Sequence, residues 1–140
     1  MATEQEQFIR NWEREFETTI KVLRAYPADK LDLKPSEKSK SARDLLFVFA
    51  SEHYLFNMAL DGNINWTMQP PKVPVTLEEI VRVTEKGHAE LVVKLKGMPD
   101  AAFEKTVAFP VAPNTMGQVR VMDLSWMLLH DSIHHRGQIS

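Results

Sequence analysis

The stretch Gly62-Asn-Ile-Asn-Trp-Thr-Met-Gln-Pro-Pro-Lys-Val-Pro-Val75 separates two helical segments and decides how they can be arranged. Its prolines rule out a continuous helix, because each one removes a backbone donor and clashes with the preceding turn. Fully extended, a stretch of about 14 residues covers about 45 Å, whereas a helix of about 20 residues spans only about 30 Å. The connection can therefore cross a whole helical bundle, which lets the helices before and after it run parallel.

The segments on either side of this connection carry helix-start signals and helical periodicity. Ser41 is a typical N-cap for a helix over about 42–60. Thr76 opens a Thr-Leu-Glu-Glu capping box, which predicts a second helix over about 77–95. The apolar stripe of the first of these helices consists of Leu45, Leu46, Phe49, His53, Phe56 and Leu60.

Two more helices, over about 4–26 and from about 121 onward, complete the pattern. In the first, apolar residues recur at steps of three and four until Pro27 stops the helix. The last is apolar nearly all round and still runs at Ser140, so we expect it to be truncated there. We predict one all-α domain over 1–140: a four-helix bundle in up-down-down-up order, with a long crossover between helices two and three.

The helical pattern breaks between Pro99 and Val119. Residues 105–110 and 118–121 alternate enough between apolar and polar side chains to predict short extended pieces. Both pieces are brief, and no sheet is predicted.

Composition excludes several classes of protein. The net charge is −2 without a basic block, so we expect no nucleic-acid partner and no membrane partner. The acidic, polar N-terminus is unlike a signal peptide, and no apolar run reaches the roughly 20 residues of a membrane span. The chain has no cysteine, which excludes disulfides, thiolate metal sites and a cysteine nucleophile, and which suits a cytoplasmic location.

Three of the five histidines fall within Leu-His-Asp-Ser-Ile-His-His-Arg-Gly-Gln, residues 129–138. On a helix, His130 and His134 stand at positions i and i+4, so their Cβ atoms lie about 5–6 Å apart on one face. Two imidazoles in that arrangement can bind a single divalent ion. The spacing therefore indicates a metal site on the last helix.

Three features together resemble the DinB-like (DinB/YfiT-type) superfamily of bacterial proteins: the Ser-Ala-Arg-Asp-Leu-Leu sequence from Ser41, the proline-rich crossover, and the closing run over 130–140. The resemblance implies an up-down-down-up four-helix bundle that forms a homodimer. It also implies a divalent ion, zinc or nickel, held by a histidine of the second helix and a His-x-x-x-His pair of the fourth. Characterised relatives include thiol transferases that use bacillithiol and mycothiol-dependent isomerases, while others are known only as stress- or damage-inducible.

The chain differs at one position from the metal-ligand pattern that this resemblance implies. Val48 stands where the family often has the histidine of the second helix. We take His53 as its replacement, Glu52 is a rival on the nearer face, and a site that binds no metal is the third reading. The predicted metal ligands are His53, His130 and His134, and the residues expected around them are Glu52, Asp131 and His135.

The functional prediction is a metal-dependent transferase that acts on a small-molecule substrate with a low-molecular-weight thiol. Because the chain has no cysteine, that thiol has to come from a cosubstrate. The alternatives are a metal-dependent hydrolase and a non-catalytic stress-associated dimer with a vestigial metal site. His88 falls in a charged stretch of the third helix, and we predict that it is a surface histidine.

Overall fold

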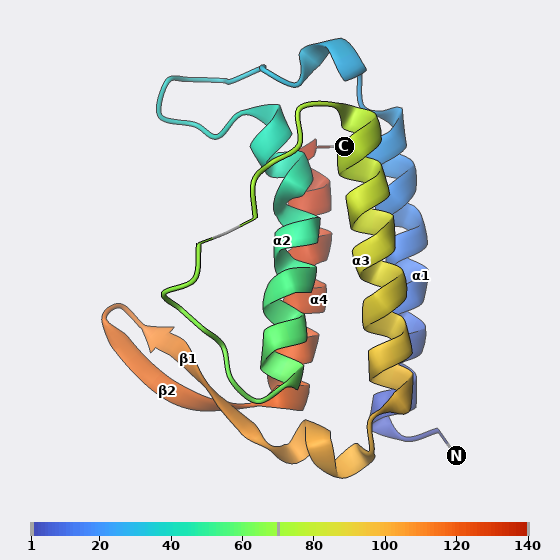
Figure 1. The fold of residues 1–140 in the computed structure, drawn as a ribbon, viewed down its shortest axis with the longest axis vertical. Helices are drawn as coiled ribbons and strands as arrows, with labels where there is room; N and C mark the ends of the chain where they lie inside the picture. Colours follow the sequence, from blue (N-terminus) through green and yellow to red (C-terminus); the bar gives the residue numbers. More distant parts are fainter. Residues whose placement is uncertain (1, 70, 140) are drawn as a thin grey trace.

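Within the described residues, 2–69 and 71–139, the computed structural model contains four α-helices (Figure 1). Helix α1 spans Glu4–Ala25, α2 spans Ala42–Leu60, α3 spans Leu77–Gly97 and α4 spans Val121–Ile139. These bounds confirm the four predicted helices. None of the helices in the described part of the chain combines the length and the apolar character that crossing a membrane requires.

Helices α1, α2 and α3 begin where a side chain satisfies a free backbone N–H group of the first turn. Thr3 accepts a hydrogen bond from the backbone N–H of Glu6, whose carboxylate accepts one from the backbone N–H of Thr3. Ser41 and Thr76 cap α2 and α3 by accepting from the backbone N–H three residues later. Each such cap contributes about 1 kcal/mol, so local sequence fixes where these helices start.

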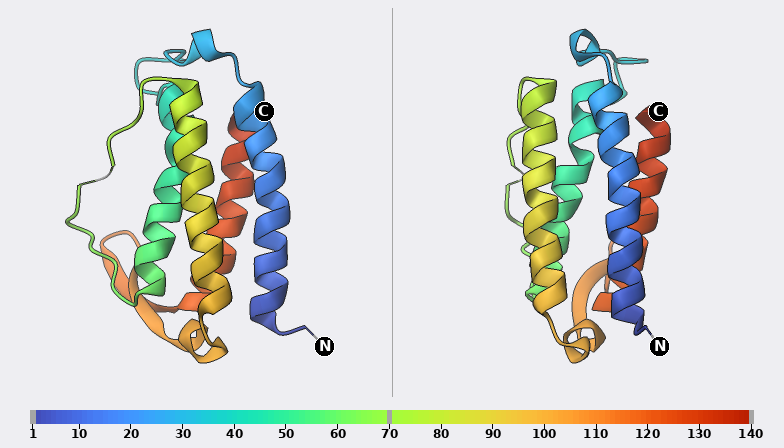
Figure 2. Two further views of the ribbon diagram at one scale, coloured as in Figure 1. Left: turned by 45° about the vertical axis from the view of Figure 1, so that its right-hand side comes forward. Right: turned by 90° about the vertical axis from the view of Figure 1, so that its right-hand side faces the viewer.

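The four helices pack side by side, and the two views in Figure 2 show their arrangement. Helices α1 and α2 each pack against both α3 and α4. After α2, the chain passes along the outside of the bundle and returns to the end at which α2 began, where α3 starts (Figure 1). The long connection is therefore what brings α3 beside α2.

Two clusters of buried apolar side chains follow each other along the bundle. Phe56 belongs to one cluster, where its ring meets that of Trp12 edge to face at 5.2 Å. Phe49, one of the most buried residues, belongs to the other. Full burial of such a side chain contributes about 1.5–3 kcal/mol. Between these two rings on α2 lie Glu52 and His53, which are buried polar residues.

A β-hairpin precedes α4, so the prediction of an all-α fold without a sheet is wrong in this segment. Strands β1, Thr106–Ala112, and β2, Thr115–Arg120, pair antiparallel. Asn114 makes the tight turn possible with a φ of 57°, a left-handed conformation that asparagine tolerates better than most residues. Val107 of β1 is buried and belongs to the same apolar cluster as Phe56. The Pro-Asn turn between two alternating segments was the available sequence signal.

Candidate metal centre

His53 lies on the face of α2 that packs towards α1 and α3. Its ring meets those of Trp12 and Phe16 edge to face at centroid distances of 5.5 and 5.7 Å. Its Nδ1 forms a hydrogen bond with the backbone carbonyl oxygen of Phe49. Because a carbonyl oxygen only accepts, Nδ1 is the donor and carries the proton. Burial lowers the pKa of His53 from 6.5 to about 4. At neutral pH the ring is therefore uncharged, and its buried Nε2 has no hydrogen-bond partner among the described residues.

His130 and His134 lie on an exposed face of α4. They line a shallow pocket together with Phe109 of the hairpin and Met127. No cluster of potential metal-ligand atoms among the described residues contains either of them together with His53. The structure therefore does not bring the three predicted ligands together.

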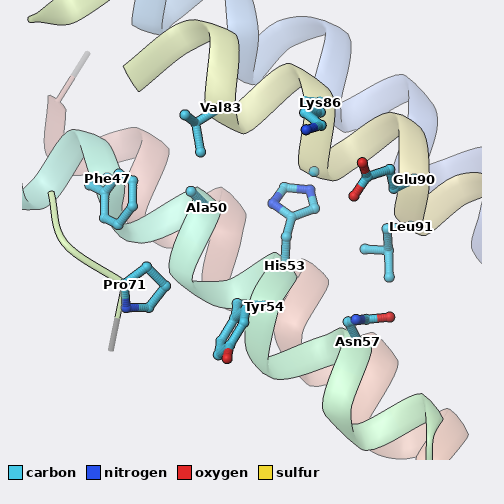
Figure 3. A pocket seen from close by; sticks show the side chains of 11 residues that line it. Phe47, Ala50, His53, Tyr54, Asn57, Pro71, Val83, Lys86, Glu90 and Leu91 are labelled. Atoms are coloured by element: carbon cyan, nitrogen blue, oxygen red, sulfur yellow. The ribbon is translucent and has the colours of Figure 1, made fainter. Parts of the chain in front are cut away.

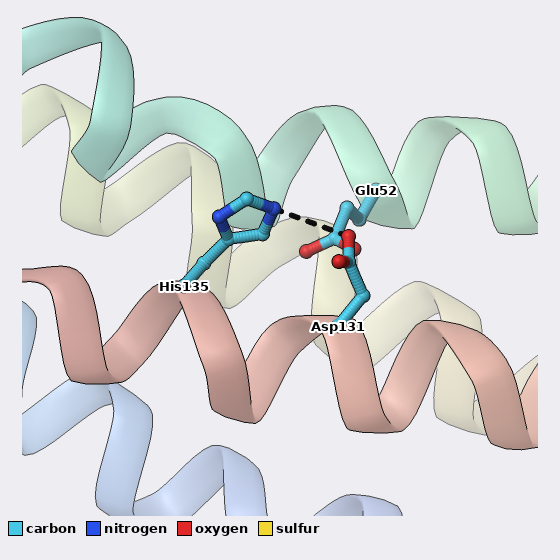
Figure 4. A group of neighbouring side chains, drawn as sticks. All are labelled: Glu52, Asp131 and His135. Atoms are coloured by element: carbon cyan, nitrogen blue, oxygen red, sulfur yellow. Dashed lines mark hydrogen bonds and ion pairs between the residues drawn. The ribbon is translucent and has the colours of Figure 1, made fainter.

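The structure instead brings together the three residues that we expected around those ligands. Glu52 of α2 and Asp131 and His135 of α4 each offer one ligand atom, and these atoms all lie within 4.8 Å of one another. Figure 4 shows the three side chains meeting between the two helices. Asp131 and His135 stand at i and i+4, the same spacing that His130 and His134 have.

The His135 ring is oriented by a residue one turn further along α4. Its Nδ1 lies 2.8 Å from Oε1 of Gln138, and its Nε2 lies 3.1 Å from Oδ2 of Asp131. Because an amide oxygen accepts, it favours the tautomer with the proton on Nδ1, which turns the Nε2 lone pair towards the two carboxylates. Metal-binding histidines commonly have such a partner on the second ring nitrogen.

Glu52 is the residue of this cluster that most needs a positive charge beside it. It is 7% exposed, and neither carboxylate oxygen has a hydrogen-bond donor within the described residues. Burial raises the pKa of Glu52 from 4.5 to about 9, and the neighbouring Asp131 acts in the same direction. A buried, unpartnered carboxylate beside a second carboxylate and an imidazole is a donor set that fits a divalent cation.

An ion pair with α1 holds α4 in the rotation that turns Asp131 and His135 towards α2. Arg136 donates to the backbone oxygen of Glu15 at 3.1 Å and to its Oε2 at 2.9 Å. Both side chains are largely buried. Since Arg136 follows His135 directly, its anchor to α1 restricts how α4 can turn about its axis.

His88 is half-buried, so the prediction of a surface histidine is wrong. Its ring stacks on that of Phe16 with the centroids 3.6 Å apart. Burial lowers the pKa of His88 to about 4, and the nearby His53 acts in the same direction. Ile80 and Thr84, which are fully buried, precede His88 by two turns and one turn of α3. That spacing of four was the sequence signal that placed His88 on the inner face.

Solved structures of other proteins share this fold. The DinB-like protein YjoA from Bacillus subtilis is 17% identical, with a TM-score of 0.71 over 95% of this chain and 87% of that one. YfiT from Bacillus subtilis, described as a probable metal-dependent hydrolase with an unusual four-helix bundle topology, is 16% identical, with a TM-score of 0.74 over 99% and 86%. A mutant of the mycothiol-dependent maleylpyruvate isomerase is 13% identical, with a TM-score of 0.71 over 100% and 64%.

At these identities the likeness shows the fold alone. No curated protein matches the sequence significantly. The model of the DinB family matches residues 1–140, the whole length of the chain. This chain, a four-helix bundle with a carboxylate-rich cluster between α2 and α4, therefore belongs to the DinB family.

Proposed function

We propose that Glu52, Asp131 and His135 bind one divalent metal ion. The observation that carries the proposal is the convergence of their ligand atoms within 4.8 Å. The buried, unpartnered oxygens of Glu52 support it, because a cation would give them a partner and stabilise the ionised form that burial and Asp131 disfavour. In this proposal, His53 and the His130–His134 pair are not ligands.

Two carboxylates and one imidazole suit zinc best among the common divalent metals. Zinc accepts both imidazole nitrogen and carboxylate oxygen, and its catalytic sites keep three protein ligands and one open position. Imidazole also suits nickel, whereas carboxylate, carbonyl and water ligands suit manganese. A metal with an open position lowers the pKa of a water or a thiol that binds to it. We therefore propose a metal-dependent enzyme.

The pocket beside the cluster is the proposed substrate site. It has a volume of about 470 Å³ and is lined by Phe109, Met127, Leu128, His130, Asp131 and His134. Asp131 belongs to both the pocket and the cluster, so a ligand in the pocket has its reacting group close to the proposed ion. His130 and His134 bring imidazole nitrogens to this pocket, and Phe109, Met127 and Leu128 give it an apolar surface.

We propose a transferase that uses a low-molecular-weight thiol as cosubstrate. Because the chain has no cysteine, the reacting sulfur in this proposal comes from outside the chain. The mycothiol dependence stated for one structural neighbour is in keeping with this class of cosubstrate. The second candidate is a hydrolase, which the description of YfiT favours. Both use the same cluster and pocket.

Metal content tests the ligand set. We expect tag-free protein reconstituted with zinc to hold about one equivalent by elemental analysis. Glu52→Gln and His135→Gln should each reduce the content at least tenfold. His53→Gln is the matched control and should retain the metal. Loss of metal in the His53 variant with retention in the Glu52 variant would reverse the assignment, and less than about a tenth of an equivalent in the unmodified protein would favour a vestigial site.

Activity assays separate the two reaction classes. Zinc-loaded protein is incubated with electrophiles in the presence of bacillithiol, mycothiol or glutathione, and separately with ester and amide substrates. We expect thiol conjugation that disappears in Glu52→Gln. Hydrolysis without any dependence on thiol would support the hydrolase instead. Activity that persists after complete removal of metal would refute the metal-dependent mechanism.

A further inference from the structure

A second cavity lies between α2, α3 and the crossover, and it shares no residue with the proposed metal centre (Figure 3). Its volume is about 290 Å³, close to the lower limit for small-molecule sites. Phe47, Val83 and Leu91 give it an apolar wall, and Pro71 of the crossover covers one side. The cavity is therefore shaped for a small molecule with a hydrocarbon part.

Gly87 in the wall of this cavity has no packing reason to be glycine. It lies in the interior of α3, where glycine is less stable than alanine. A Cβ at this position would meet only the Cβ of His53, at an ordinary contact distance of 3.8 Å. Alanine would therefore fit without a clash. Gly87 lines the cavity, and the absence of a methyl group at this position leaves more space in it.

His53 closes the same cavity from α2 (Figure 3). It is 7% exposed, and its Nε2 is an acceptor without a partner among the described residues. Buried polar groups without a partner are uncommon in proteins. Because Nε2 is itself buried, His53 forms part of the wall of this cavity and does not contact the ligand head group.

The cavity also has one charge of each sign. Lys86 and Glu90 both line it and stand at i and i+4 on α3, so their Cβ atoms are about 5–6 Å apart. Neither forms an ion pair or a hydrogen bond with any residue in the described part of the chain. An ammonium and a carboxylate at this spacing can bracket a ligand head group that carries both charges.

We propose that this cavity binds a small zwitterion of the α-amino acid class with an apolar side chain. The ligand carboxylate pairs with Lys86 and its ammonium group with Glu90. The hydrocarbon side chain occupies the apolar wall, in the space that Gly87 leaves open. This site is independent of the metal centre, since binding uses none of the proposed metal ligands.

The probe is L-leucine, titrated into the metal-free protein and followed by NMR through the imidazole resonances of His53. We expect saturable shifts with a dissociation constant on the order of 1 mM. Two analogues each lack one charge: 3-methylbutylamine has no carboxylate, and 4-methylpentanoate has no ammonium group. Both should bind at least tenfold more weakly. No saturable shift with leucine, or equal affinity for either analogue, would overturn the proposal.

Gly87→Ala gives a result that a merely structural glycine would not give. We expect its Tm to rise by about 2–4 °C, because alanine is the better helix former, while leucine affinity falls at least tenfold. Gly97→Ala is the matched control, because Gly97 ends the same helix, has nothing within 4 Å of where an added methyl group would lie, and does not line the cavity. Unchanged leucine affinity in Gly87→Ala would refute the site, whatever happens to Tm.

Discussion

Replacing Glu52 by glutamine should stabilise the metal-free protein, and the gain should depend on pH. The side chain is buried, and its pKa rises from 4.5 in the unfolded chain to about 9 in the folded one. Between these two values the folded state binds more protons than the unfolded state. The free energy of unfolding therefore falls as the pH rises through this range.

The magnitude follows from the same two pKa values. From pH 4.5 to pH 7, at about 1.36 kcal/mol per pH unit, Glu52 lowers the free energy of unfolding by about 3 kcal/mol. Glutamine has nearly the same shape and no proton to lose. Glu52→Gln should therefore match the unmodified protein near pH 4.5 and exceed it by up to about 3 kcal/mol at pH 7.

The assay is urea unfolding of both proteins in a metal chelator at pH 4.5, 5.5, 6.5 and 7.5. The difference between the two proteins matters more than either profile, because other groups titrate in the same range. His53, for example, has a pKa lowered to about 4, so it makes the free energy of unfolding rise with pH between about 4 and 6.5. That contribution is common to both proteins and cancels. A difference that stays constant with pH would refute the electrostatic reasoning about Glu52.

Three further predictions concern the centre and its scaffold. Metal binding should release protons at pH 7, because the carboxyl group of Glu52 has a pKa of about 9 and must ionise to bind the metal. Calorimetry in buffers of different ionisation enthalpy measures this proton release. A binding enthalpy that is independent of the buffer would contradict the prediction. Arg136→Met should lower the free energy of unfolding by about 1–3 kcal/mol by leaving Glu15 without its partner, and Glu15→Gln in the same background should recover part of the loss in urea unfolding. Gly117→Ala should lower the free energy of unfolding by about 1–3 kcal/mol, because the added Cβ would lie 2.8 Å from Cγ1 of Val111 in the hairpin. Val111→Ala in the same background should relieve the clash. Equal stability of Gly117→Ala and the unmodified protein in urea unfolding would show that there is no clash.

The sequence by itself determined the helices and the family. N-cap side chains act on backbone groups within three residues, so Ser41 and Thr76 specify where α2 and α3 begin without help from distant parts of the chain. The proline-rich connection likewise specifies a long crossover, because proline excludes a helix there. The hairpin was harder to predict, since its short strands depend on pairing with each other and on the burial of Val107.

Only the tertiary structure decided which side chains face one another. The pairs His130–His134 and Asp131–His135 have the same spacing on α4, and the sequence cannot say which pair points at α2. The same holds for the neighbours Glu52 and His53, which are about 100° apart around their helix. The choice depends on how far each helix is rotated about its axis, and packing between helices sets that rotation, with Arg136 tying α4 to α1.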